Sequence, residues 1–104
     1  MGDYRINISE PADNDIRDTI RYISTQLLEP ATALEMLDTF QMEIKTLSTF
    51  PHRCPLVNDE RLARLGYRIL QVKNYLVFFS INEKDNIVDI ERILYQRRNW
   101  KHLL

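Results

Sequence analysis

Glycine and cysteine are both scarce in this chain of 104 residues, which contains two glycines and one cysteine. Phosphate-binding loops need several closely spaced glycines, so no Walker-type or other glycine-rich phosphate loop is present. A single cysteine, Cys54, excludes an intrachain disulfide and is typical of a reducing compartment. No His or Asp constellation around Cys54 prepares it as a nucleophile, so we interpret it as a packed thiol.

Long apolar runs are missing as well. No stretch approaches the ~20 apolar residues that span a bilayer. The opening "MGDYRINISE" lacks the basic segment and apolar run of a secretory signal. The two histidines, His52 and His102, lie far apart and have no metal-ligand spacing. We therefore expect one domain over residues 1–104, with no membrane contact, no metal and no cofactor.

The net charge of −1 conceals an uneven distribution of charge along the chain. Residues 1–60 carry 5 Lys and Arg against 11 Asp and Glu, whereas residues 61–104 carry 9 against 4. An acidic half joined to a basic half indicates a basic surface that meets an anionic partner. The sequence pI near 6.1 argues against a protein that coats nucleic acid without selectivity.

The first half of the chain predicts one strand followed by two helices. "YRINIS" alternates, which places Tyr4, Ile6 and Ile8 on one side of a strand. A helix begins at Ser9 or Glu10, and a second begins at Pro30 and ends near "TFPHRCP". The short connection between them predicts an antiparallel helical hairpin. The apolar positions at helical spacing are Ile16, Ile20, Ile23 and Leu27, then Leu34, Leu37, Phe40, Ile44 and Leu47.

The second half predicts a loop, "LVNDERLARLGY", followed by three strands. After Gly66 the spacing of apolar residues changes to two, over "YRILQV", "YLVFFSI" and "IVDIERILY". A tight Lys73–Asn74 turn, with the asparagine at positive φ, joins the first two strands, and "NEKDN" joins the last two. The middle strand is nearly all apolar, which predicts a central position.

These elements predict an α+β fold. The order is β-α-α-β-β-β, and the three consecutive strands form an antiparallel meander. We expect a two-layer sandwich, with the helical hairpin packed on one face of a mainly antiparallel sheet. The other face of the sheet is then left free for function.

Two strand arginines are candidates for a functional role because alternation places them in apolar rows. An arginine in such a row needs water at an edge, a carboxylate or an anionic ligand. The structural alternative is an ion pair, for example with Glu91, Asp89 or the acidic first helix. The predicted rows are Arg68, Leu70 and Val72 in one strand, and Val88, Ile90, Arg92 and Leu94 in the last strand.

Three more candidates follow the last strand, in "RRNW". The guanidinium groups of Arg97 and Arg98 can bind phosphate or carboxylate, and the indole of Trp100 can stack. The alternative is an ordinary solvated terminus in which Trp100 packs back on the core.

The sequence resembles the RelE/ParE superfamily of bacterial toxins over nearly its whole length. The resemblance rests on "EPADNDIRDTIRYI", "TLSTFPHRCP", "GYRILQVKNYLVFFSIN" and the ending "VDIERILYQRRNW". It implies a cytoplasmic bacterial toxin of a type II toxin–antitoxin module, which halts growth unless a cognate antitoxin binds it in a hetero-oligomer. It also implies a cellular target, either DNA gyrase or the ribosome and its mRNA.

The superfamily divides by mechanism. RelE-like toxins cut mRNA in the ribosomal A site, whereas ParE-like toxins poison DNA gyrase. The ending "RILYQRRNW" resembles the ParE-like and plasmid-stabilisation pattern, in which a histidine often stands at the position of Tyr95. Cutting RNA by 2′-hydroxyl attack needs a base, an acid and cations. A tyrosine is ordinarily a poor base at neutral pH, and Glu91 is the other conceivable base.

We therefore expect gyrase poisoning. A metal-independent endoribonuclease that cuts mRNA on the ribosome, or an inactive homologue, is the alternative. The predicted catalytic residues, for the nuclease alternative alone, are Arg68, Arg92 and Tyr95. The residues predicted to contact the target or the antitoxin are Arg68, Arg97, Arg98 and Trp100.

Overall fold

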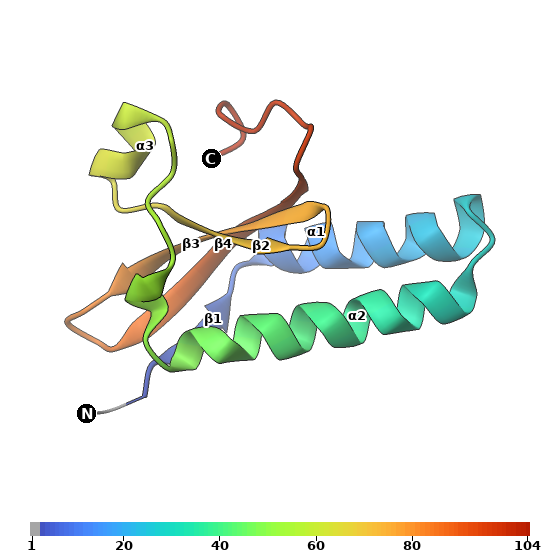
Figure 1. The fold of residues 1–104 in the computed structure, drawn as a ribbon, viewed down its shortest axis with the longest axis horizontal. Helices are drawn as coiled ribbons and strands as arrows, with labels where there is room; N and C mark the ends of the chain where they lie inside the picture. Colours follow the sequence, from blue (N-terminus) through green and yellow to red (C-terminus); the bar gives the residue numbers. More distant parts are fainter. Residues whose placement is uncertain (1–2) are drawn as a thin grey trace.

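The computed structural model describes residues 3–104 and confirms the predicted α+β fold and element order (Figure 1). A single-turn π-helix over Tyr22–Gln26 extends α1, and short 3₁₀ turns follow α2. The strands are β1 (Arg5–Ile8), β2 (Arg68–Val72), β3 (Tyr75–Asn82) and β4 (Ile87–Tyr95), and the helices are α1 (Glu10–Arg21), α2 (Pro30–Lys45) and α3 (Glu60–Arg64).

The sheet has the order β1-β4-β3-β2, so β3 is central, as predicted. Strands β2, β3 and β4 form the antiparallel meander, and β1 pairs with β4 in parallel. Ser9 fixes the start of α1 against β4 while it caps the helix. Its hydroxyl donates to the backbone oxygen of Glu91 at 2.9 Å and accepts from the backbone N–H of Ala12 at 3.1 Å.

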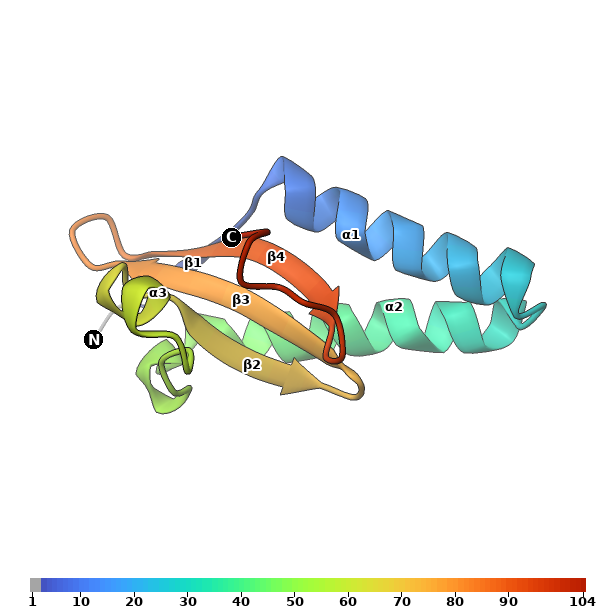
Figure 2. The ribbon, with the colours of Figure 1, turned by 90° about the horizontal axis from the view of Figure 1, so that it is seen from above.

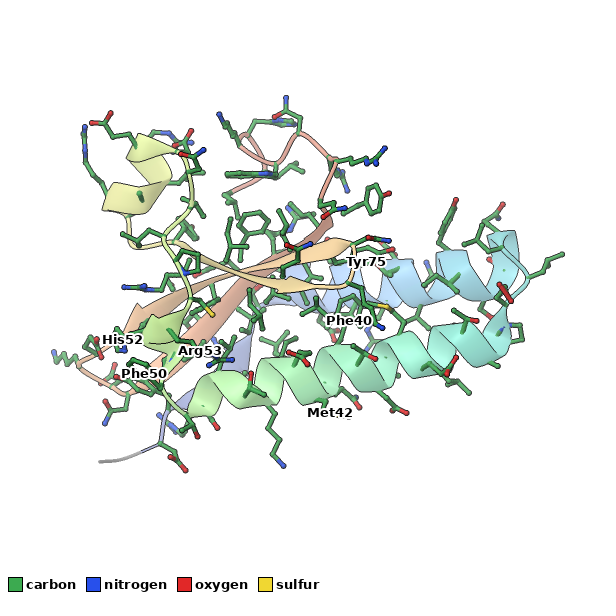
Figure 3. All side chains as sticks on the ribbon, in the orientation of Figure 1. Phe40, Met42, Phe50, His52, Arg53 and Tyr75 are labelled. Atoms are coloured by element: carbon green, nitrogen blue, oxygen red, sulfur yellow. The ribbon has the colours of Figure 1, made fainter. Side chains whose placement is uncertain are left out.

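Helices α1 and α2 cover one face of the sheet and extend well beyond it (Figures 1 and 2). Phe40 of α2 points at Tyr75 of β3 (Figure 3), with ring centroids 5.5 Å apart. Leu27 and Leu34 belong to the predicted apolar faces of the two helices but are 51% and 63% exposed. The prediction is wrong there because the far part of the hairpin has no sheet beneath it. The helix-side core includes Ala12, Phe40, Ile44, Leu47, Val77, Phe79, Val88, Ile90 and Ile93.

The second face of the sheet is covered too, so the prediction of a free face is wrong. Part of the predicted loop forms α3, whose start is capped by Asp59 accepting from the Leu62 backbone N–H at 3.0 Å. Helix α3 and the C-terminal segment lie on the side opposite α1 and α2 (Figure 1). The buried residues of this second cluster are Val57, Leu62, Phe78 and Leu94, with Tyr67, Ile69, Leu76, Trp100, Leu103 and Leu104 packed around them.

A β-bulge in β4 changes which face its side chains occupy. Phe78 pairs with Arg92 and Phe79 pairs with Ile90, so Glu91 is an extra residue in β4. Alternation therefore breaks at Glu91, and the predicted single row of Val88, Ile90, Arg92 and Leu94 is wrong. Val88, Ile90 and Ile93 face the helices, whereas Leu94 packs in the second cluster.

The β2–β3 turn differs from the prediction in one residue. Lys73, with φ of 56°, adopts the left-handed conformation that we expected of Asn74. This conformation costs a lysine roughly 1–2 kcal/mol, whereas asparagine tolerates it better. The turn therefore carries a small local strain where β2 and β3 meet the helical hairpin.

Three segments that are distant in sequence meet at the opposite end of the sheet, around Glu83. The Tyr4 hydroxyl donates to one carboxylate oxygen of Glu83 at 2.6 Å, and Nε2 of His52 lies 2.5 Å from the other. The hydrogen bond from Tyr4, followed by the contact with His52, holds the pKa of Glu83 below its ordinary 4.5. A carboxylate with a lowered pKa stabilises the folded state above its unfolded pKa, and this is lost as pH falls through the folded pKa.

We expect Glu83→Gln to lower the melting temperature at neutral pH but not at acid pH. Below the folded pKa the wild-type carboxyl is protonated too, so the two proteins then become alike. Thermal unfolding followed by circular dichroism across this pH range measures the difference, with Glu35→Gln, an exposed glutamate on α2, as the control. If Glu83→Gln lowered the melting temperature equally at neutral and at acid pH, the stabilising role of the ionised Glu83 carboxylate would be contradicted.

Candidate functional site

The three residues predicted for catalysis lie apart in the structure. Arg68 is on the helix side of β2, where its Nη1 donates to the backbone oxygens of Cys54 at 2.6 Å and His52 at 3.4 Å. Arg68 pairs with Phe79, whereas Tyr95 pairs with Tyr75. Phe79 and Tyr75 are four steps apart along β3, which separates the two positions by about 13 Å.

Arg92 forms the ion pair that was its structural alternative. Its Nε and Nη2 donate to the two carboxylate oxygens of Asp15 in α1, at 2.8 and 2.9 Å. The backbone N–H of Ile93 donates to the same carboxylate at 2.9 Å. The Arg92 and Asp15 side chains are 21% and 11% exposed. Asp15 therefore ties α1 to β4 beyond the point where β1 ends.

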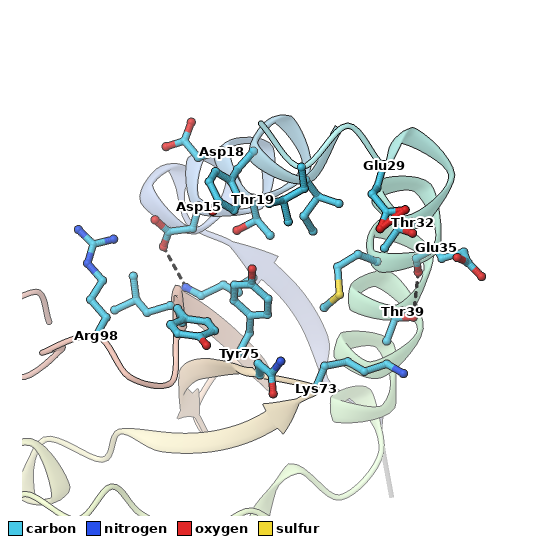
Figure 4. Close-up of a pocket in the computed structure, with 18 residues that line it drawn as sticks. Asp15, Asp18, Thr19, Glu29, Thr32, Glu35, Thr39, Lys73, Tyr75 and Arg98 are labelled. Atoms are coloured by element: carbon cyan, nitrogen blue, oxygen red, sulfur yellow. Dashed lines mark hydrogen bonds between the residues drawn. The ribbon is translucent and has the colours of Figure 1, made fainter. Parts of the chain in front are cut away.

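The predicted binding residues after β4 separate as well. Trp100 packs on Phe78, with ring centroids 4.9 Å apart, and belongs to the second cluster. Arg97 and Arg98 are both exposed, and Arg98 lines the edge of a groove beside α1 (Figure 4). Of Arg68, Arg97, Arg98 and Trp100, this groove is lined by Arg98 alone. The four residues do not form one surface.

The groove, with a volume of about 1000 Å³, lies between the helical hairpin and the end of the sheet (Figure 4). It exists because the hairpin extends past the β2–β3 turn. The residues that line the groove recur at helical spacing in α1 and α2, so one face of each helix forms a wall of the groove. The wall residues are Asp15, Asp18, Thr19, Tyr22 and Ile23 on the α1 side, and Thr32, Glu35, Met36 and Thr39 on α2.

Aromatic side chains form the floor of the groove. Tyr75 lies edge to face with Tyr95, with ring centroids 5.7 Å apart, and Phe40 supports it from below. Burial, and then the neighbouring Tyr95, raise the pKa of Tyr75 above its ordinary value. The floor is therefore apolar and neutral, with hydroxyl groups at its surface. Tyr95, one of the three residues predicted for catalysis in the nuclease alternative, is part of this floor and is 43% exposed.

Opposite charges stand on the two sides of the groove. Glu29, Glu35 and Asp18 lie on the hairpin, whereas Lys73 and Arg98 lie at the end of the sheet (Figure 4). Asp18 contacts Arg21 at 3.3 Å, but within residues 3–104 neither Glu29 nor Glu35 forms an ion pair. Our sequence reasoning missed these carboxylates. One sequence pattern could have indicated them. Thr32, Glu35 and Thr39 recur at helical spacing and form a mixed polar face on the second helix, which is typical of a binding surface.

A smaller polar cluster lies on the second face, around the bulge. The Ser80 hydroxyl donates to a carboxylate oxygen of Glu91 at 3.2 Å. Burial raises the pKa of Glu91 above its ordinary value although this hydrogen bond lowers it, and Asp89 raises it further. A carboxyl with a raised pKa can act as a general acid or base. The neighbouring Arg92, however, is already neutralised by Asp15.

Residues 3–104 contain neither a metal-binding cluster nor a helix suited to crossing a membrane. No group of three or more His, Cys, Asp or Glu side chains is placed to hold a metal ion. In the same residues, no helix combines the length and the apolar composition that crossing a bilayer requires.

Three solved structures that share the fold are a ParDE toxin–antitoxin system, the RelBE2 toxin–antitoxin complex and a RelE–RelB complex. The chromosomal ParDE system from Pseudomonas aeruginosa gives a TM-score of 0.72 at 17% identity, covering 88% of this chain and 95% of that chain. The RelBE2 complex from Mycobacterium tuberculosis gives 0.60 at 18% identity, covering 89% and 98%. The RelE–RelB complex from Pyrococcus horikoshii gives 0.56 at 15% identity, covering 91% and 97%. No functionally curated protein sequence matches this chain significantly.

The fold is thus shared with toxins of the RelE/ParE superfamily. The family model for the ParE toxin of the type II toxin–antitoxin system parDE matches residues 6–100, which is nearly the whole chain. The chain therefore belongs to the ParE toxin family of type II toxin–antitoxin systems.

Proposed function

We propose that this toxin arrests growth by binding and poisoning DNA gyrase, and that a cognate antitoxin neutralises it. The separation of Arg68, Arg92 and Tyr95 carries the first part of this proposal. Cleaving RNA requires a base, an acid and cations around one phosphate. Arg68 instead donates to backbone oxygens on the helix side, and Arg92 is paired with Asp15. This arrangement favours a toxin that acts by binding.

The groove supports the second part of the proposal, a protein partner. Its apolar floor with charged walls has the composition of helix-binding grooves in protein complexes. Two of its lining residues, Tyr22 and Leu27, are 52% and 51% exposed, and exposed apolar side chains of this kind are a surface that a partner covers. The ParDE, RelBE2 and RelE–RelB structures of the same fold are toxin–antitoxin systems or complexes. We propose that an antitoxin segment occupies the groove here.

Inducing this toxin in bacteria without antitoxin is expected to produce double-strand DNA breaks and an SOS response while transcripts stay intact. Pulsed-field electrophoresis and transcript end mapping measure the two effects. Glu91→Gln keeps a hydrogen-bond acceptor for Ser80 but removes the remaining candidate base, so growth arrest should persist in this variant.

Other outcomes of the same experiment would contradict the proposal. Transcripts cut at A-site codons with intact DNA, and loss of arrest in Glu91→Gln, would establish ribosome-dependent mRNA cleavage with Glu91 as the base. Normal growth with abundant folded protein would show an inactive homologue. Coexpression of the antitoxin is the control, since it should restore growth.

A further inference from the structure

We propose that the groove accepts a basic amphipathic helix, so that the part of the antitoxin bound here is cationic on the side facing α1 and α2. This inference rests on the proposed antitoxin partner and specifies its recognition chemistry. The basic half of the toxin sequence predicts a basic surface that meets an anionic partner. The structure distributes the charges differently, because the hairpin walls of the groove are acidic.

The shape of the groove fits a helix. Along α2 the wall runs from Thr32 to Thr39, a rise of about 10 Å over two turns of helix. A partner helix lying in this space would present about two turns to the toxin. Tyr22, Met36 and Tyr75 offer apolar contacts to one face of that helix.

The charges then decide which polar residues the partner helix carries. Glu29 and Glu35 lie on the hairpin wall without an ion pair within residues 3–104, and both are exposed. Lysine or arginine on the partner would neutralise them, whereas glutamate would be repelled. Lys73 and Arg98 lie at opposite ends of the groove (Figure 4), so each would pair with a different carboxylate of the same partner helix.

The same charges argue against nucleic acid as the occupant of the groove. Phosphate groups dominate the affinity of proteins for nucleic acids, and they need Lys and Arg around them. Here Lys73 and Arg98 come from the end of the sheet, while carboxylates line the two helices. A polypeptide can satisfy both signs of charge along a single helix, but a phosphate backbone cannot.

The direct test compares two synthetic helical peptides that share one leucine face and differ on the polar face, which carries Lys in one and Glu in the other. We expect the Lys peptide to bind the full chain, made by cell-free synthesis, on the order of tenfold more tightly than the Glu peptide at low salt. The variant Glu29→Lys with Glu35→Lys should abolish or reverse this preference. The control is Asp38→Lys with Glu43→Lys, which makes the same charge change on α2 outside the groove and should preserve it.

Equal binding of the two peptides, or an unchanged preference in the Glu29→Lys, Glu35→Lys variant, would overturn this inference. The inference would also fail if that variant still bound the natural antitoxin normally but no longer arrested growth, because the groove would then be the target surface. Failure of the basic-helix inference is distinguishable from failure of the gyrase proposal. DNA breaks are measured in cells and do not depend on peptide preference.

Discussion

Replacing Asp15 by alanine is expected to lower the free energy of unfolding by about 3–5 kcal/mol. The substitution leaves the largely buried guanidinium of Arg92 without its carboxylate and removes the acceptor of the Ile93 N–H. A buried charge or N–H that loses its hydrogen-bond partner destabilises the folded state by its full desolvation penalty. Urea unfolding followed by circular dichroism measures the loss.

Asp13 in the same helix provides a matched control for this prediction. It pairs with Arg17 at 2.8 Å, but the two side chains are 50% and 68% exposed. Exposed pairs contribute little, so Asp13→Ala should cost less than about 1 kcal/mol. If Asp15→Ala cost no more than Asp13→Ala, the attachment of α1 to β4 would not depend on this ion pair.

Trp100→Ala is expected to lower the free energy of unfolding by about 2–3 kcal/mol, less than the ~3–5 kcal/mol of a fully buried tryptophan. The indole covers Phe78 and is only partly exposed, so its removal uncovers the second cluster. Because Trp100 is part of the fold, growth arrest should decline in proportion to the folded fraction. Thermal unfolding and growth assays at several temperatures measure the two effects together.

Lys101→Ala is the control, because the Lys101 side chain is exposed and the contact with Arg61 uses its backbone oxygen. This variant should unfold like the wild type. Unchanged stability with complete loss of growth arrest in Trp100→Ala would return Trp100 to the role predicted from sequence, that of a partner contact.

The order of strands and helices could be predicted from the sequence because it depends on local patterns. Apolar residues recur every two positions in β2 and β3 and at helical spacing in α1 and α2, and both patterns can be recognised in the sequence. The short helix α3 was missed, although Asp59 followed by Glu60 is a helix-start signal. Such a brief helix needs tertiary contacts, here those of Leu62, to be stable.

The candidate site could not be predicted in the same way. The extra residue Glu91 changes the side on which Leu94 packs, yet nothing in the alternation of "IVDIERILY" marks a bulge. The groove arises from a mismatch of lengths, since α2 has 16 residues, about 24 Å, and β2 has 5, about 17 Å. Those lengths could be estimated from sequence, but the end at which the excess of helix projects depends on packing.

The parallel pairing of β1 with β4 sets when this toxin can first fold during its synthesis. Asn7 of β1 bonds to Asp89 of β4 across 82 residues of chain. At about 5–20 residues per second, the ribosome adds that interval in roughly 4–16 s. Until then β1 has no strand beside it, and pairing of such long range is slow in itself. A newly made chain therefore passes through an interval of several seconds in which β4 is not yet available to β1 and the folded toxin cannot yet exist.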